Sequence, residues 1–173
     1  FKGPGQNALT ASGMEVVPSL YNLLVRLKNE GYNVGKLPAN PQELAKMIQA
    51  QGAVFGTYAE GAYTKFLQSG HPALVTAHQF AGWTQKALSK KMIKEMNQLY
   101  GSFPGKYMAT DDGKLAVARL QFGNVVLIPQ PAAGLGDDDF QIVHGTDAAP
   151  PHYYVAAYLL SLIHISEPTR HLR

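Results

Sequence analysis

The sequence predicts an α/β protein: a partial layered domain in which helices pack on a small sheet. Three observations predict this class. Apolar residues recur at helical spacing over the first hundred residues, the spacing becomes that of strands over residues 114–128, and a long Pro/Gly/Asp-rich loop follows at 129–151. The chain has 173 residues, of which 46% are hydrophobic and 16% charged, so it can bury a core.

Four helices are expected before the strands. The first runs from about Pro18, which suits a first helical turn, to Gly31, which suits a C-terminal cap. The second begins at residues 40–43 (NPQE), where the asparagine can cap the helix and the glutamate stands three residues later. Two further apolar stripes predict helices over residues 79–88 and 90–100.

Two strands are expected after these helices. Residues 114–122 (KLAVARLQF) alternate like a half-buried strand, and residues 124–129 (NVVLIP) are an apolar run typical of an inner one. Gly123-Asn124 predicts a hairpin between them, with a bulge in one continuous strand as the alternative. A last helix is expected from about His152, and residues 1–13 are interpreted as a loop that follows a strand outside this sequence.

Composition and motif content argue against several kinds of site and partner. The chain has no cysteine, so disulfides, thiolate metal sites and a cysteine nucleophile are excluded. It has no run of about 18 apolar residues, so no membrane span is expected. Basic residues form no stripe interleaved with aromatics, so nucleic acid is not an expected partner. The loop of residues 3–13 lacks the Gly-Lys-Ser/Thr ending of a phosphate-binding loop.

Residues 160–173 are interpreted as a non-native tail. Residues 161–170 read SLIHISEPTR, and with the preceding leucine they resemble a translated sequencing adapter. The sequence therefore predicts one native segment, residues 1–159, followed by a tail that is no part of the native fold.

Three motifs occur in order along the native segment. The first consists of Gly13, Glu15 and Ser19, before a helix that ends in Gly31-Tyr32. The second is Tyr100-Gly101 with Pro104-Gly105. The third consists of Gly123-Asn124-Val125, Gln130-Pro131, Val143-His144 and Pro150-Pro151-His152 with Tyr154, Ala156 and Tyr158. Together they resemble the large, tetrapyrrole-binding subunit of the CobN/magnesium chelatase family. The resemblance covers nearly all of residues 1–159 and implies a fragment of a longer CobN-like chain.

The resemblance implies an enzyme subunit, a ligase that forms nitrogen–metal bonds. The Pro-Pro-His-x-Tyr form at residues 150–154 is more similar to cobalt-type subunits, which implies insertion of Co²⁺ into a corrin precursor in cobalamin biosynthesis. Mg²⁺ or iron are the alternative metals. The family's ATP is hydrolysed by separate AAA+ partner subunits and is not expected to bind here. The fragment alone is expected to be inactive, and the implied location is the bacterial cytoplasm.

One departure from the family pattern keeps alternatives open. Ala132-Ala133 stand where many members carry an arginine that can hold a tetrapyrrole carboxylate. The alternatives are a magnesium chelatase large subunit and a haem-processing relative that removes metal from a porphyrin, periplasmic or associated with the inner membrane. An alternative of another class is a tetrapyrrole-binding module without catalysis.

Metal insertion needs a base that removes pyrrole protons and ligands that replace water around the ion. The long loop supplies such groups: His144 and His152 are predicted as catalytic bases and metal ligands, with Asp137 and Asp138 as further metal ligands. Each has a structural alternative, since a histidine can pack at a strand end or helix start and aspartates favour solvated turns. The spacing of the two histidines does not form a helical metal pair.

Two further residues are predicted to bind the tetrapyrrole. Gln130 can orient a propionate or amide edge of the macrocycle. Tyr154 can lie against the macrocycle face, although aromatic residues on a helix more often belong to the core.

Overall fold

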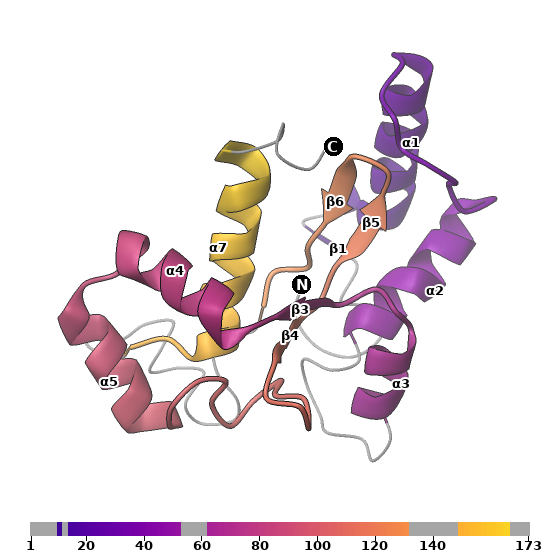
Figure 1. Cartoon of the computed structure of the whole chain (residues 1–173). Helices are drawn as coiled ribbons and strands as arrows, with labels where there is room; N and C mark the ends of the chain where they lie inside the picture. The colour runs from indigo at the N-terminus through magenta and orange to yellow at the C-terminus, as the bar shows by residue number, and fades with distance from the viewer. Residues whose placement is uncertain (1–9, 12–13, 53–61, 132–148, 167–173) are drawn as a thin grey trace. The chain divides into compact units, whose positions relative to one another are not determined.

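The computed structural model describes residues 10–11, 14–52, 62–131 and 149–166. The chain divides into two compact units. Unit 1 comprises Phe1–Pro72 with Ala118–Gln130, and unit 2 comprises Ala73–Val117 with Pro131–Arg173. The described residues combine helices with short antiparallel strand pairs, which confirms the predicted α/β class (Figure 1).

Unit 1 contains, among its described residues, three helices and two antiparallel strand pairs. These are β1 (Thr10–Ala11) with β2 (Met14–Glu15), α1 (Val16–Asn29), α2 (Pro41–Gly52), α3 (Ala62–Gln68), and β5 (Leu120–Phe122) with β6 (Val125–Leu127). The first two predicted helices are confirmed. The β1–β2 pair lies where only a loop was expected, and α3 lies where no regular element was predicted.

The start of α2 shows why the sequence signal there was reliable. Asn40 Oδ1 accepts a hydrogen bond from the backbone N–H of Glu43 at 2.9 Å, and Glu43 Oε2 accepts one from the N–H of Ala39 at 2.8 Å. Both bonds satisfy donors that a helix start leaves unpaired. The apolar stripe of α2 then contributes to the core of unit 1, which consists of Val17, Leu24, Val34, Leu44, Ile48, Leu120 and Phe122.

The predicted hairpin is confirmed, and its turn is bound to the loop after α1. Phe122 pairs with Val125 around the Gly123-Asn124 turn. The Asn124 N–H donates to the backbone oxygen of Asn33 at 2.8 Å. Two of the sequence motifs, one ending near residue 32 and one beginning at residue 123, are therefore joined in unit 1.

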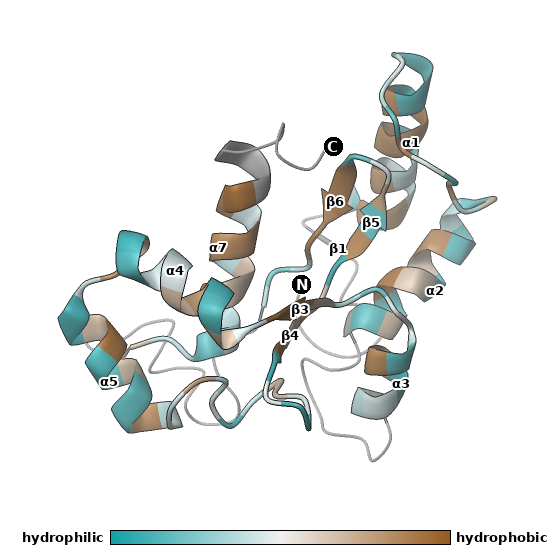
Figure 2. Cartoon of the chain, viewed as in Figure 1, coloured by the Kyte–Doolittle hydropathy of each residue, from teal (hydrophilic) through white to brown (hydrophobic). Residues whose placement is uncertain are grey.

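Unit 2 contains, among its described residues, three helices and one antiparallel strand pair. These are β3 (Ala73–Val75) paired with β4 (Leu115–Val117), α4 (Ala77–Ala87), α5 (Lys90–Tyr100) and α7 (His152–Ser166). α7 packs against β4 and α4, and most of it is apolar (Figure 2). All three residues of β4 are buried. In the described ranges, no helix is long and apolar enough to cross a membrane.

One detail of the strand predictions was wrong. The expected strand over residues 114–122 is two strands, because β4 pairs with β3 in unit 2 and β5 pairs with β6 in unit 1. The chain changes partner at Ala118-Arg119, and β4 is buried throughout instead of alternating. The helix predicted over residues 90–100 is confirmed as α5, in which Met96 is buried and the side chains of Met92 and Leu99 are exposed.

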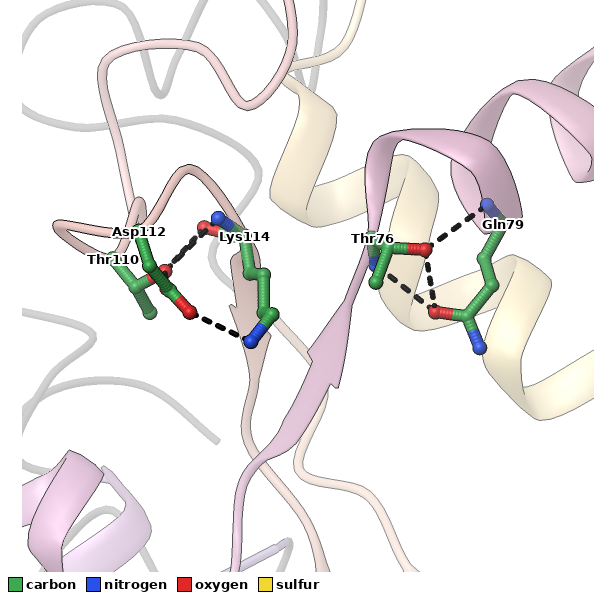
Figure 3. A network of polar contacts seen from close by, with 5 residues as sticks. All are labelled: Thr76, Gln79, Thr110, Asp112 and Lys114. Carbon is green, nitrogen blue, oxygen red and sulfur yellow. Dashed lines mark hydrogen bonds and ion pairs between the residues drawn. The ribbon is translucent and has the colours of Figure 1, made fainter.

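Local side-chain hydrogen bonds fix the ends of elements in unit 2 (Figure 3). Thr76 and Gln79 form a capping box at the start of α4, with Thr76 Oγ1 accepting from the Gln79 N–H and Gln79 Oε1 accepting from the Thr76 N–H. Before β4, Thr110 Oγ1 accepts from the Lys114 N–H at 2.9 Å, and Lys114 Nζ lies 2.6 Å from Asp112 Oδ2. The hydrogen bond from Lys114 lowers the pKa of Asp112. These contacts hold the turn that leads into β4.

Candidate functional site

His152, the first residue of α7, lies in the core of unit 2. It follows two prolines, and only 2% of its surface is exposed. Its Nε2 lies 3.1 Å from Oδ1 of Asn97, a residue of the last turn of α5. The hydrogen bond therefore connects the start of α7 to the end of α5, across 55 residues of sequence.

Two phenylalanines and a glycine enclose the His152 ring. The ring centroid lies 5.6 Å from that of Phe80 and 6.2 Å from that of Phe103. Gly105 lies so close to the ring that a Cβ added there would be 2.7 Å from His152 Nδ1. The Pro104-Gly105 motif and the Pro150-Pro151-His152 motif, far apart in sequence, thus meet in one cluster.

This environment favours a neutral imidazole. Burial lowers the pKa of His152, because the charged form loses its hydration. Nδ1 has no hydrogen-bond partner among the described residues and is shielded from water. A neutral imidazole with one bare nitrogen can accept a proton or bind a cation. The described residues, however, include no group of three or more potential metal ligands, so they do not form a metal centre by themselves.

The lowered pKa of His152 predicts that unit 2 loses stability in acid. Below pH 6.5, the ordinary pKa of histidine, the unfolded chain binds the proton more readily than the folded chain does. The free energy of unfolding should therefore fall as pH drops below 6.5, with a limiting slope of about 1.4 kcal/mol per pH unit for one proton. Urea unfolding at a series of pH values measures this slope. His152→Leu should reduce it, and His78→Leu, at an exposed position, should not. An unchanged slope in His152→Leu would contradict the assignment.

The tyrosines of α7 divide between the core and the surface. Tyr153 is 5% exposed and packs edge-on against Tyr107, with ring centroids 6.3 Å apart. Tyr154 is half-buried, Tyr158 is 44% exposed, and their ring centroids are 4.9 Å apart. A hydrogen bond to Tyr158, with some burial, raises the pKa of Tyr154 to about 12. Tyr154 and Tyr158 thus lie on the more open side of α7.

Tyr158→Phe should lower the pKa of Tyr154 from about 12 toward its ordinary value of about 10, because it removes the hydroxyl that bonds the neutral phenol. Titration of ¹³Cζ-labelled tyrosine by NMR resolves the residue. Tyr32→Phe, at an exposed position in unit 1, is the matched control and should leave Tyr154 unchanged. If both variants gave the same Tyr154 titration, the Tyr154–Tyr158 bond would be absent in solution.

Gln130 lies at a pocket of unit 1. The pocket has a volume of about 350 Å³, within the range of small-molecule sites. Apart from Gln51 and Gln130 its lining is apolar and comes from α1, α2 and the β5–β6 hairpin with the residues after it. Gln51 is buried and donates from Nε2 to Ser69 Oγ at 3.2 Å, while its Oε1 has no partner among the described residues. Gln130 is exposed, so its carboxamide is available to a ligand.

The remaining predicted site residues, His144, Asp137 and Asp138, lie outside the described residues. The structure thus places His152 and Tyr154 together on α7 in unit 2, and Gln130 at the pocket of unit 1. Sequence reasoning missed Asn97, whose only signal was an asparagine inside a helix, a position where that residue is unfavourable. The sequence indicated the Pro104-Gly105 motif, but it did not reveal that Gly105 lies against His152.

Comparisons with known proteins bear on the whole chain. Residues 2–161 match the protein family described as CobN/Magnesium Chelatase. An uncharacterised protein of Methanocaldococcus jannaschii is 30% identical over 86% of this chain and 12% of its own length. A magnesium-chelatase subunit of Rhodobacter capsulatus is 31% identical over 86% of this chain and 11% of its own. The aerobic cobaltochelatase subunit CobN of a Sinorhizobium species is 25% identical over 84% of this chain and 11% of its own.

The chain thus spans about one eighth of the length of these relatives or less. The family match, in contrast, extends over nearly the whole chain and includes the motifs that meet around His152. The chain belongs to the CobN/magnesium chelatase family.

Proposed function

We propose that the parent protein of this chain is the large, tetrapyrrole-binding subunit of an ATP-dependent class I metal chelatase. The single observation that carries the proposal is the family match over residues 2–161. In this proposal, separate AAA+ subunits hydrolyse ATP, the parent acts in the bacterial cytoplasm, and this fragment alone is inactive. The clustering of two family motifs around a neutral, buried imidazole supports a specialised role for that part of the chain.

The site residues have distinct proposed roles. His152 is proposed as a base or metal ligand through its bare Nδ1, which can take a pyrrole proton or hold the ion during transfer. His144, Asp137 and Asp138 are proposed to complete the ligand set.

Two residues are proposed to hold the tetrapyrrole. The half-buried ring of Tyr154, paired with Tyr158, offers an aromatic surface to the macrocycle. The exposed Gln130 can bond a propionate or amide at the edge of the macrocycle, beside a pocket whose lining is mainly apolar.

Cobalt is the proposed metal and a corrin precursor the proposed macrocycle, in cobalamin biosynthesis. The Pro-Pro-His-x-Tyr form of residues 150–154 supports this choice. Magnesium chelatase is the second candidate. It is supported by the identity of this chain to the magnesium-chelatase subunit of R. capsulatus, which is 31%, compared with 25% to the CobN subunit. A haem-processing relative remains the third, in the periplasm or at the inner membrane.

Metal exchange by the full-length parent with its AAA+ subunits tests the proposal. Absorbance spectra would follow a metal-free corrin precursor with Co²⁺, protoporphyrin with Mg²⁺, and haem, each with and without ATP. We expect ATP-dependent cobalt insertion, slowed about 10²- to 10⁴-fold by His152→Ala if this residue is the base. His78→Ala, at an exposed position, is the control.

The other outcomes distinguish the alternatives. ATP-dependent magnesium insertion would identify a magnesium chelatase in place of a cobalt chelatase. Loss of metal from haem would favour the haem-processing relative. Tetrapyrrole binding without exchange under any condition would identify a non-catalytic binding module. Failure to bind any of the three macrocycles would overturn the proposed function.

A further inference from the structure

The two nitrogens of the His152 ring have different surroundings. Nε2 lies 3.1 Å from Asn97 Oδ1, within hydrogen-bond distance. Nδ1 faces Gly105 and has no partner among the described residues. A neutral imidazole carries its proton on one nitrogen only, so this asymmetry decides which nitrogen is left bare.

With the Asn97 carboxamide oxygen facing Nε2, the asymmetry favours the tautomer with the proton on Nε2. In that form Nε2–H donates to Asn97 Oδ1, and the bare Nδ1 is a buried acceptor without a donor. The opposite tautomer would bury an N–H at Nδ1 without an acceptor. Unpaired buried donors are rarer in proteins than unpaired acceptors, and either costs about 1–3 kcal/mol.

The position of Asn97 supports a specific role. It lies in the last turn of α5, where its backbone oxygen accepts from the Gly101 N–H. Asparagine is among the less favourable residues inside a helix, because its side chain competes for backbone hydrogen bonds. Here its carboxamide oxygen instead reaches the imidazole of another helix.

Gly105 keeps side-chain atoms away from the other nitrogen. A Cβ at this position would lie 2.7 Å from Nδ1 and 3.4 Å from Cε1 of His152. Any larger residue would therefore occupy the space beside Nδ1. The glycine thus leaves only backbone beside Nδ1 on this side of the ring.

We propose that Asn97 is a positioning residue of the site: by accepting the Nε2 proton of His152, it fixes Nδ1 as the nitrogen that receives a proton or a metal ion. The inference rests on the proposed function only in assigning Nδ1 to proton or metal transfer. The arrangement follows the general pattern in which a partner on one imidazole nitrogen sets the chemistry of the other.

Imidazole ¹⁵N NMR of the full 173-residue chain at neutral pH tests the assignment. His152 should give the signature of Nε2–H with a bare Nδ1. Asn97→Leu, which is similar in size but has no acceptor, should shift the population toward the Nδ1–H tautomer. Gln98→Leu, at an exposed position on the same helix, should change nothing. The inference would be overturned if wild-type His152 carried its proton on Nδ1, a result that does not depend on how the variant folds. It would also be overturned if Asn97→Leu left the ratio of the two His152 tautomers unaltered.

Metal exchange by the full-length parent supplies the functional readout. Asn97→Leu should lower the exchange rate about 10- to 100-fold, as loss of a partner of a ligating histidine usually does, with the affinity for the tetrapyrrole unchanged. In a His152→Ala background the same substitution should have no further effect, because it acts through that histidine. An equal loss in both backgrounds would overturn the positioning role. A wild-type parent that exchanges no metal would instead overturn the proposed function, and the tautomer measurement would still decide the Asn97–His152 assignment.

Discussion

Gly123→Ala is expected to destabilise unit 1 by about 2–5 kcal/mol. Gly123 has a φ of +55°, a conformation that costs an alanine about 1–2 kcal/mol. Its Cβ would also overlap the backbone oxygen of Asn33 and lie 2.8 Å from the carbonyl carbon. These are backbone atoms and cannot rotate away, so the hairpin turn would have to move. That movement would break the hydrogen bond from the Asn124 N–H to Asn33.

Gly31→Ala is the matched control for this prediction. Gly31 also lies in unit 1 and has a positive φ of +87°, but no atom lies within 4 Å of a Cβ built there. The control should therefore show only the conformational cost of about 1–2 kcal/mol. Urea unfolding followed by circular dichroism measures both losses. Equal losses would mean that the hairpin turn does not lie against Asn33 in solution.

The elements predicted well are those whose ends are fixed by neighbours in sequence. α2 begins where residues 40–43 predicted it, because Asn40 and Glu43 cap the helix through bonds that span three or four residues. α5 spans the predicted residues 90–100, with Ser89 as its cap. The hairpin followed from the turn chemistry of Gly123-Asn124 alone. In each case the signal and the structure lie within a few residues of each other.

The elements that were missed depend on partners distant in sequence. β3 is three residues long and exists through its pairing with β4, about forty residues later. The strand predicted over residues 114–122 is divided because its first part pairs with β3 and its last part with β6. An alternating pattern cannot reveal that the partner changes at Ala118-Arg119, since both halves have strand-like composition.

The candidate site shows the same limit. The sequence indicated His152 as a residue of interest, and the resemblance placed Pro104-Gly105 in a family motif. Neither could show that Asn97 bonds to His152 across 55 residues, or that the backbone of Gly105 lies against Nδ1. These are consequences of tertiary packing in unit 2. The roles of His144, Asp137 and Asp138 remain predictions from the sequence.

Gly105→Ala is expected to destabilise unit 2 by about 2–5 kcal/mol. Gly105 has a φ of +82°, and its added Cβ would lie 2.7 Å from His152 Nδ1. The ring has little freedom to move away, because Nε2 is bonded to Asn97 and the rings of Phe80 and Phe103 pack against the imidazole. Gly113→Ala is the control in the same unit, since Gly113 has a φ of +75° and open space around its Cβ. The control should lose only about 1–2 kcal/mol.

A double-mutant cycle with His152→Ala separates the two causes of the loss. Removing the imidazole removes the atom that the new Cβ would meet, so Gly105→Ala should cost only its conformational part, about 1–2 kcal/mol, in that background. The difference between the two backgrounds, about 1–3 kcal/mol, measures the contact itself. Urea unfolding of the four proteins gives this coupling energy. A coupling energy of zero would mean that the Gly105 backbone does not lie against Nδ1 in solution. A positive value would mean that the Gly105 backbone packs against Nδ1, the nitrogen assigned to the chemistry of the site.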